Sequence, residues 1–595
     1  MCGIIGQLSK TNKVNQGLFD SMRDTLAHRG PDGYGTQLLH DGYVAFGHRR
    51  LAILDLTDDG NQPMSNSSGD LWVTFNGEIY NYPDLKNILL EEGYSFKSKS
   101  DTEVLLHGYK CWGIEGLLKR LKGMFAFALW DEREGKLLAA RDRFGIKPFV
   151  YYCNEKQFVF ASEIKAIKKN SELNLELNEE SLADYFSYGY VPYPNTIWKS
   201  TFKLPPASYL EVDFQTFNLD VRTYWTLQSS DNIVNRKEAV ERTQQLIQNA
   251  TKEHLLSDVP VGVFLSGGYD SSTLLMHMHD LGYPTKAFTI GFPESESSEH
   301  IEAAVVARHF HAEHYIENIS SENDVLSLLQ EMSFYYDEPF AANSMINTYV
   351  ISRLASKHVK VALSGEGADE VFAGYKWHKK IDKYYTEFTI KERIKNLIKG
   401  NYSSKSVYME LYNRSMTGVM NEALELDLLS DNLRDQIRKR RLWHFEEFYI
   451  ETRDKLKLTQ FIDAKTFVPD HCLFRADISS MAHSLEVRVP FLDHDIYEYV
   501  FSLHPSVYFE NNRKKILIED NLKNRMPREV LDMPKRGFSF QNTDKIFDER
   551  FMRIMEEGIL MKQGVLKRQA DFRKLSTQMK FHLLNLEFWF ERYSN

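Results

Sequence analysis

The chain has 595 residues, of which 43% are hydrophobic and 26% are charged, values typical of a globular protein with two or three domains. Its formal net charge of −10 argues against a nucleic-acid-binding surface, and no apolar run approaches the ~20 residues that a membrane-spanning helix requires. Only four cysteines occur, without a CxxC pair, which argues against a disulfide framework or a zinc site and favours a reducing cytoplasm.

The first part of the chain, residues 1–215, is rich in short β-type runs separated by glycine and proline. Runs such as "DLWVTFNGEIY" and "GMFAFALWDE" have the alternation and the residue types that are typical of strands. We therefore predict a first domain of packed sheets with helices, one of them near "SDTEVLLHGYKCWG". The polar stretch "TLQSSDNIVNRKEAV" overlaps a predicted linker at 216–235.

Residues 236–595 show a different pattern, in which apolar strands alternate with helical segments. The runs "VPVGVFLSGG", "TKAFTIGF" and "VKVALSGEG" each end in glycine or polar residues. Such alternation predicts an α/β domain with a mostly parallel sheet. The segment from about 375 to 470 is charged and helical in pattern, so we expect a helical C-terminal part.

The chain begins "MCGIIG", which places Cys2 one processing step from the amino terminus. A lipoprotein cysteine would follow a basic and then apolar leader, whereas only Met1 precedes Cys2. If Met1 is removed, Cys2 carries both a thiol and the α-amino group, whose pKa of ~7.7 to 8.0 suits a base for that thiol. The alternative interpretation is an inert cysteine.

Attack of a thiolate on an amide creates an oxyanion, which requires hydrogen-bond donors in fixed positions. The stretch "TFNGEIYN" offers the side-chain amide of Asn76 and the backbone N–H of Gly77. Arg50 in "GHRRLAILDL" suits a substrate carboxylate, and Asp101 in "SKSDTE" suits a substrate ammonium group. Each also has an ordinary structural interpretation, namely a hairpin turn, an exposed arginine pair and a helix cap.

Taken in order, the segments of the first domain resemble the glutaminase domain of class II, N-terminal-nucleophile glutamine amidotransferases. The segments are "MCGIIG", "HRGPDGYG", "GHRRLAILDL", "NQPM", "FNGEIYN", "SDTE", "GMFAFALWD" and "ARDRFGIKP". The resemblance implies an α+β sandwich of two packed antiparallel sheets flanked by helices. It also implies that Cys2, as the mature amino terminus, hydrolyses glutamine to glutamate and ammonia, with Asn76 and Gly77 as the oxyanion hole. The implied glutamine-binding residues are Arg50, Asn76, Gly77, Glu78 and Asp101.

In the second half, "VPVGVFLSGGYDSSTLL" predicts a strand, a glycine turn and the start of a helix. Ser266, Gly267 and Gly268 would expose backbone N–H groups at a helix amino terminus, which favours an anion such as pyrophosphate. The lysine of a GxxxxGK[ST] loop is missing, so this is not a Walker loop. Asp270, followed by Ser271, suits the Mg²⁺ that accompanies ATP phosphates.

A second strand end, "VKVALSGEGADEVFAGY", supplies Ser364, Gly365, Glu366 and Asp369. Ligands of parallel sheets bind beyond the carboxyl ends of the strands, where both loops would lie. Two acidic loops meeting there would suit a metal-bound nucleotide.

Two basic residues stand among apolar neighbours, Arg488 in "LEVRVPFLD" and Lys535 in "MPKRGFSF". A lysine there would neutralise charge on the α-phosphate as pyrophosphate leaves. Without that context, a surface lysine is the alternative interpretation.

This half resembles the ATP-pyrophosphatase-type synthetase domain of asparagine synthetases, most clearly in "SGGYDSS" and "LSGEGADEVFAGY". The resemblance implies that ATP is cleaved between its α and β phosphates. Asp270 and Asp369 would bind Mg²⁺, and Glu366 and Lys535 would assist adenylation. The implied ATP-binding residues are Leu265, Ser266, Gly267, Gly268, Asp270, Ser271, Ile290, Ser364 and Gly365.

The two halves together predict a ligase that converts aspartate, ATP and glutamine into asparagine, AMP, pyrophosphate and glutamate. Ammonia is a nucleophile only when unprotonated, so a shielded passage between the domains is expected. The family also suggests a homodimer.

The sequence leaves two alternatives for the identity of the acceptor carboxylate. The family often has "DEPFADSSAIPTY" where this chain has "DEPFAANSMINTY", with departures at Ala342, Asn343, Met345 and Asn347, and Tyr269 replaces a usual aliphatic residue. Some relatives amidate uronic acids of surface polysaccharides or carboxylates of cell-wall precursors, which is the second interpretation.

Two further alternatives are a binding protein that retains the fold and an enzyme that shares only the first domain. The first would have lost functional groups at Cys2, Asp270 or Asp369, and all three are present. The second, a pure glutaminase or a sugar-phosphate aminotransferase, would lack the ATP-binding segments.

Overall fold

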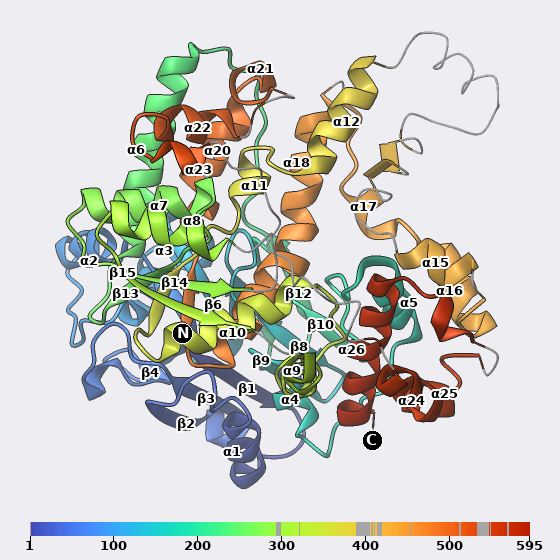
Figure 1. Cartoon of the computed structure of the whole chain (residues 1–595). Coiled ribbons are helices and arrows are strands. Elements are labelled where there is room, and N and C mark those ends of the chain that lie inside the picture. The colour runs from blue at the N-terminus through green and yellow to red at the C-terminus, as the bar shows by residue number, and fades with distance from the viewer. Residues whose placement is uncertain are drawn as a thin grey trace.

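The computed structural model of the chain contains two antiparallel sheets, one parallel sheet and many C-terminal helices (Figure 1). It describes residues 2–292, 299–319, 322–387, 405, 408–409, 411–412, 419–425, 427–452, 454–510, 513, 515–531, 547, 549–567 and 570–594. Among the helices in these ranges, none combines the length and the apolar character needed to cross a bilayer.

The first domain contains two six-stranded sheets, and every strand pair in them is antiparallel. The first sheet has the order β10-β8-β9-β1-β3-β2 and the second β12-β11-β7-β6-β5-β4. The bounds are β1 Gly3–Ser9, β2 Gly33–Leu39, β3 Val44–Arg50, β4 Met64–Ser65, β5 Leu71–Ile79, β6 Gly123–Asp131, β7 Lys136–Arg141, β8 Val150–Cys153, β9 Gln157–Ala161, β10 Thr201–Lys203, β11 Ser208–Asp213 and β12 Leu219–Thr223.

The two sheets pack face to face and are covered on their outer faces by helices. Between the sheets, Phe46 and Phe160 of the first pack with Ala128 and Trp130 of the second. The helices are α1 Gln16–Asp24, α2 Tyr82–Glu91, α3 Thr102–Arg120, α4 Ile164–Lys168 and α5 Glu179–Tyr188. Because α3 packs on β5 and β6, strand β6 is buried at all but its first position. The predicted sandwich is confirmed.

The second domain is built on a parallel sheet of five strands in the order β15-β14-β13-β16-β17. Its strands are β13 Val261–Phe264, β14 Lys286–Gly291, β15 Glu313–Asn318, β16 Val361–Leu363 and β17 Glu486–Arg488. Its first helices are α6 Arg236–His254, α7 Tyr269–Asp280, α8 His300–His309, α9 Glu322–Tyr335 and α10 Ser344–Ser356. The three segments predicted as strands form β13, β14 and β16, so the predicted α/β unit is also confirmed.

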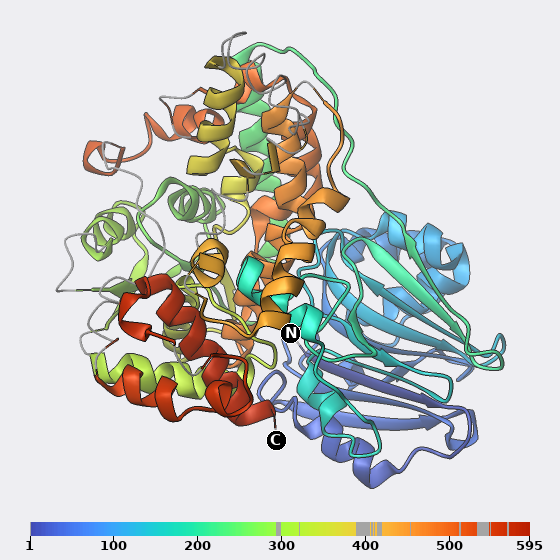
Figure 2. The ribbon, with the colours of Figure 1, turned by 90° about the vertical axis from the view of Figure 1, so that its right-hand side faces the viewer.

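The rest of the chain is mainly helical, as expected, and Figure 2 shows the antiparallel sheets on one side of the molecule and these helices on the other. The bounds are α11 Ala368–Val371, α12 Lys376–Glu387, α15 Val419–Glu425, α16 Asp431–Arg440, α17 Trp443–Glu447, α18 Lys455–Lys465, π-helix η3 Val468–Leu473, α19 Phe474–Met481, α20 His494–Ser502, α21 Pro505–Tyr508, α22 Ile516–Leu522, α23 Arg528–Leu531, α24 Glu549–Glu557, α25 Ile559–Lys562 and α26 Thr577–Tyr593.

Two segments join the domains. The stretch 216–235, predicted as the linker, contains β12, which pairs with β11 of the second sheet, and α6 begins at Arg236. The last helix, α26, packs back on the first domain, where the Tyr185 hydroxyl donates to the His582 carbonyl oxygen at 2.8 Å and Trp198 contacts Trp589.

Candidate active sites of the two domains

Cys2 and Asn76 lie together at the edge of the sandwich core. The Cys2 backbone N–H donates to Asn76 Oδ1 at 2.9 Å, and because an N–H can only donate, this contact fixes the orientation of the Asn76 amide. Asn76 Nδ2 is then buried and makes no hydrogen bond within the described part of the chain. A buried donor without an acceptor, next to a buried thiol, is the arrangement that an oxyanion would satisfy.

Gly77 has a structural requirement besides its predicted role. A Cβ atom at this position would lie 2.1 Å from the Met124 carbonyl oxygen and 2.7 Å from Phe125 Cα. Only glycine allows β5 and β6 to approach this closely. The Asn-Gly pair is therefore part of a strand, not of a hairpin turn.

Arg50, at the end of β3, binds a neighbouring loop in this structure. Its guanidinium donates to the Thr57 carbonyl oxygen at 2.7 Å, to Asn61 Oδ1 at 2.9 Å and to the Asp55 carbonyl oxygen. These contacts hold the 55–61 loop against the strand. The role predicted for Arg50 in binding the glutamine carboxylate stays a prediction.

Glu78 and Asp101 belong to a buried cluster that also includes residues of the second domain. Asp101 accepts a hydrogen bond from the Ile79 N–H at 2.8 Å, and burial raises the pKa of Asp101 to about 7. Burial, together with the negative charges of Glu486 and Asp101, also raises the pKa of Glu78. Arg488, whose side chain is fully buried, lies 3.5 Å from Glu78 Oε1 and 2.6 Å from Glu486 Oε1. The second domain thus closes one wall of the predicted glutamine site.

Arg29 makes a second connection across the domains, and the sequence reasoning assigned it no role. Its Nε donates to the Cys2 carbonyl oxygen at 3.1 Å, while its other nitrogens bind Glu163 at 2.7 Å and Asp477 at 2.8 Å. Arg29 lies within the quoted segment "HRGPDGYG", but its partners are 134 and 448 residues away. The resemblance to the family includes the segment that contains Arg29, but the segment does not show which residues Arg29 binds.

The predicted phosphate loop is a tight turn between β13 and α7. The Ser266 N–H donates to Ser271 Oγ at 3.1 Å, and the Gly268 N–H donates to Ser266 Oγ at 3.2 Å. Gly267 has a φ of +77°, and a Cβ there would lie 2.8 Å from the Ala303 nitrogen. The loop therefore requires glycine at this position and leads directly into the amino terminus of a 12-residue helix.

Leu265 and Ile290, the other predicted nucleotide contacts on this side, are buried beside the loop. Leu265 follows β13 and donates its N–H to the Phe288 carbonyl oxygen at 2.8 Å, while Ile290 lies in β14. Both therefore lie near the carboxyl edge of the sheet, where the prediction places the nucleotide.

Asp270 and Asp369 follow adjacent parallel strands and converge on one cation, Lys515. The Lys515 Nζ lies 2.5 Å from Asp270 Oδ2 and 2.9 Å from Asp369 Oδ1. Gly374 leaves room for this pair, because a Cβ there would lie 2.0 Å from Asp369 Oδ1. The Mg²⁺ site predicted at Asp270 and Asp369 stays a prediction, since Lys515 pairs with both carboxylates in this structure. Lys515 was missed because "RKKILIED" looks like an ordinary charged helix start.

The second acidic loop connects the two sites. The N–H of Ser364, the residue before Gly365, donates to the Arg488 carbonyl oxygen at 2.8 Å. The Arg488 side chain reaches Glu78, so one residue contacts both predicted sites. Glu366 pairs with Arg475.

The segment of the predicted acceptor site lies at the start of α10, where Arg475 also donates to Ser344 Oγ. Ala342, Met345 and Asn347 are buried, and Asn347 Oδ1 has no hydrogen-bond partner among the described residues. Asn343 caps the helix without a side-chain hydrogen bond. The departures from the family pattern thus lie next to the Glu366–Arg475 pair.

Lys535 lies outside the described residues, so its predicted role is not addressed by the geometry. The last described residue before it is Leu531, whose carbonyl oxygen accepts a hydrogen bond from the Tyr269 hydroxyl at 2.8 Å. An aliphatic residue at 269 could not make this contact. This hydrogen bond gives a structural reason for tyrosine instead of an aliphatic residue at position 269.

Comparison with known proteins covers nearly the whole chain. A glutamine amidotransferase domain model matches residues 1–225, and an asparagine synthase model matches residues 242–589. The chain belongs to the asparagine synthase family. It is 32% identical to asparagine synthetase [glutamine-hydrolyzing] 1 of Bacillus subtilis, over 90% of this chain and 87% of that protein. It is 31% identical to asparagine synthetase [glutamine-hydrolyzing] 3 of the same species, over 100% and 99% of the two chains.

Family membership establishes a glutamine-dependent carbon–nitrogen ligase of the ATP-using asparagine synthase type. The family also contains relatives with other names. The chain is 28% identical to the amidase chry2 of Gibberella zeae, over 87% of this chain and 84% of that protein. Membership alone therefore does not name the acceptor.

Proposed function

We propose that this enzyme activates a carboxylic acid as an acyl-adenylate and converts it to an amide with ammonia released from glutamine at Cys2. The observation that carries the first step is the Cys2–Asn76 contact, which leaves Asn76 Nδ2 as a buried donor without an acceptor. The second step is supported by the convergence of Asp270 and Asp369 on one cation at the carboxyl edge of the parallel sheet.

In the glutaminase reaction, the Cys2 sulfur attacks the side-chain carbonyl carbon of glutamine. Burial raises the pKa of the Cys2 thiol, so a nearby base is needed, and the amine of a processed Cys2 would take the thiol proton. Asn76 Nδ2 and the Gly77 N–H would hold the resulting oxyanion. Ammonia leaves, and water then hydrolyses the thioester to glutamate.

In the synthetase reaction, an acceptor carboxylate oxygen attacks the α-phosphorus of ATP and the bond to the β-phosphate breaks, releasing pyrophosphate. Ammonia then attacks the acyl carbon, AMP leaves with its phosphate oxygen, and one proton is lost. AMP is a far better leaving group than oxide, which is the reason for activation. Lys535 is proposed to assist this step, as are Glu366 and the phosphate loop.

Mg²⁺ fits the residues present, since two carboxylates from adjacent strands form a hard oxygen donor set. Asp270 and Asp369 would hold the ion. When bound, Mg²⁺ would neutralise charge on the ATP phosphates. Lys515 now bridges these carboxylates, and the pKa of Lys515 is raised because their negative charges outweigh the effect of burial.

Aspartate is our first candidate for the acceptor, because two relatives that match most of this chain, at 32% and 31% identity, are named asparagine synthetases. A second candidate, a sugar acid or a cell-wall precursor carboxylate, is favoured by a specific observation. The buried start of α10, next to Arg475, carries Ala342, Met345 and Asn347 in place of the usual family residues.

Product analysis tests the proposal. With ammonia as nitrogen source, the enzyme should form AMP and pyrophosphate in amounts equal to the amide. Formation of ADP and phosphate instead would contradict acyl-adenylate chemistry. The cytoplasmic location and the homodimer stay predictions, which fractionation and light scattering would test.

A further inference from the structure

The loop between α9 and α10, residues 336–343, carries part of the predicted acceptor segment and contains neither helix nor strand. Its residues 336–342 are nevertheless buried. A buried irregular backbone must find hydrogen-bond partners outside itself, and a buried carboxylate needs a partner that compensates its charge. The partners of this acceptor loop therefore show which part of the molecule holds it in place.

Backbone groups of the first domain bind the acceptor loop near both of its ends. The Lys165 N–H, in α4, donates to Asp337 Oδ2 at 2.8 Å, and Lys165 Nζ donates to the Tyr335 carbonyl oxygen at 2.9 Å. The Ala341 N–H donates to the carbonyl oxygen of Gly189, which follows α5, at 2.8 Å. The loop belongs to the second domain in sequence, but these hydrogen bonds tie it to the first.

Glu338, in the middle of the loop, is buried against two residues of the first domain. Its Oε1 accepts the Ile197 N–H at 2.8 Å, and its Oε2 lies 2.5 Å from Lys203 Nζ, which also donates to the Val191 carbonyl oxygen. Burial raises the pKa of Glu338 to about 7, and the charge of Lys203 opposes that rise. Without Lys203, Glu338 would therefore be protonated at neutral pH and would lose its charge-assisted hydrogen bond.

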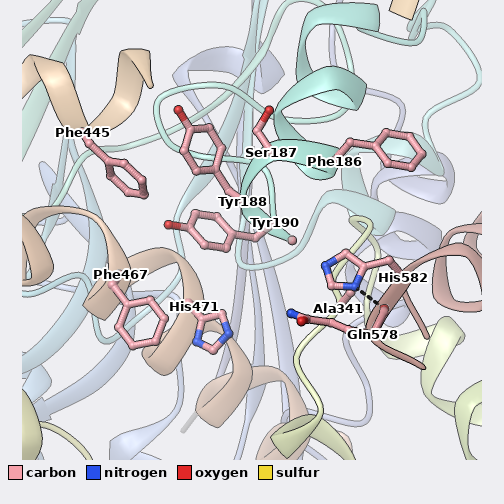
Figure 3. Close-up of a pocket in the computed structure, with 11 residues that line it drawn as sticks. Phe186, Ser187, Tyr188, Tyr190, Ala341, Phe445, Phe467, His471, Gln578 and His582 are labelled. Atoms are coloured by element: carbon pink, nitrogen blue, oxygen red, sulfur yellow. Dashed lines mark hydrogen bonds between the residues drawn. The ribbon is translucent and has the colours of Figure 1, made fainter. Parts of the chain in front are cut away.

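The contact between the domains continues at a small pocket, which Figure 3 shows. Ala341 of the acceptor loop lines it together with Tyr188 and Tyr190 of the first domain and with His582 of α26. The first domain thus lies along the loop from Asp337 to Ala341.

The far end of the loop leads to the residues predicted to act in adenylation. Ser344, the first residue of α10, accepts a hydrogen bond from Arg475, and Arg475 pairs with Glu366. Lys203 Nζ also lies 5.7 Å from the ring centre of Phe474, the residue before Arg475. A shift of the loop would therefore move Ser344 relative to the Glu366–Arg475 pair.

We infer that Lys203, a residue of the glutaminase domain, is a positioning residue for the synthetase reaction, because its pairing with Glu338 fixes the loop that precedes the acceptor site. The inference rests on the proposed function, which places the acceptor carboxylate beside this loop. The first domain then has a second task besides releasing ammonia, since it completes the framework on which the acceptor binds. This task does not involve Cys2.

The test measures AMP and pyrophosphate formation in Lys203→Met and Glu338→Gln, with ammonia as nitrogen source and with aspartate and glucuronate as acceptors. Each variant should raise KM for the acid that wild type uses about tenfold, because a buried charge-assisted hydrogen bond is lost, and should leave KM for ATP unchanged. The double variant should lose no more than either single one, since both changes break the same pair. Lys203→Arg keeps the charge and should restore most of the wild-type KM.

Lys199→Met is the matched control, because the Lys199 Nζ pairs at 3.0 Å with Glu176 where both side chains are exposed, so its loss should not change KM. Glutamate release from glutamine without ATP should be the same in every variant and in wild type. An unchanged KM for the acceptor, additive losses in the double variant, or an equal loss of glutamate release would overturn the inference alone. Absence of AMP and pyrophosphate in wild type with either acid would overturn the proposed function and the inference with it.

Discussion

The two predicted sites differ in how far the protein alone completes them. In the first domain, Cys2, Asn76, Asp101 and Glu78 are buried and held by backbone or charged partners. In the second domain, the converging carboxylates are partly exposed and are bridged by Lys515. A site for a small neutral amide group can be complete before the substrate binds. A site for a polyanionic nucleotide needs charged groups whose charge is balanced only when the nucleotide and its metal ion bind.

The largest expected effect is on glutamine-dependent synthesis, when a residue of the buried first site is replaced. Asn76→Ala removes the buried donor, and loss of one oxyanion-hole donor typically lowers kcat by about 10² to 10³. Glutamine-dependent synthesis should fall by that factor while ammonia-dependent synthesis is unchanged. Asn76→Asp is the control, because it keeps an oxygen for the Cys2 N–H but removes the donor. Full activity of Asn76→Asp would show that the donor is not needed.

A pH measurement tests the burial of Asp101. Its pKa is raised to about 7 in the folded state, so its contribution to stability is present in acid and is lost as pH rises through 7. Between pH 5 and pH 7, wild type should lose about 2 kcal/mol of unfolding free energy relative to Asp101→Asn. Urea unfolding at pH 5, 6 and 7 measures this, and parallel curves for the two proteins would contradict it.

Removal of the bridging cation tests the second site. Lys515→Met leaves Asp270 and Asp369 facing one another, and since both are partly exposed we expect a loss of about 1 kcal/mol of stability. Added Mg²⁺ should stabilise this variant more than wild type, because the ion would replace the lost charge. Thermal unfolding with and without Mg²⁺ measures the difference. An equal response of both proteins would argue against a metal site here.

The smallest effect concerns Tyr269. Tyr269→Phe removes the hydrogen bond to the Leu531 carbonyl oxygen, which should cost about 1 kcal/mol. Thermal unfolding should detect this loss, and Thr289→Val, which removes two hydroxyl contacts near the loop, should cost more and gives an upper scale for comparison. An unchanged melting temperature for Tyr269→Phe would leave the tyrosine without a structural explanation.

The sequence predicted the two sheet systems well because local patterns determine them. Strand alternation and glycine turns mark β5, β6, β13 and β16, and the order of elements gives the parallel sheet. Strand β6 is buried on both faces, because helix α3 covers one face of its sheet and the other sheet covers the opposite face. That is a property of packing between distant segments, which a local pattern does not contain.

The residues that the sequence could not assign act between distant segments. Arg29 binds Asp477, Arg488 reaches Glu78, and Lys515 joins two loops from other strands. Arg29 and Lys515 look like ordinary basic residues in their own stretches, and Arg488 stands out in its stretch only by its apolar neighbours. Only the fold brings these cations to the carboxylates that they pair with.

The central claim is that two separable reactions share one chain, and Cys2→Ala tests it most directly. We predict that purified Cys2→Ala protein forms no amide with glutamine but forms it with free ammonia at the wild-type rate, releasing AMP and pyrophosphate. Loss of the ammonia-dependent reaction in a folded Cys2→Ala protein, or survival of the glutamine-dependent one, would contradict the account.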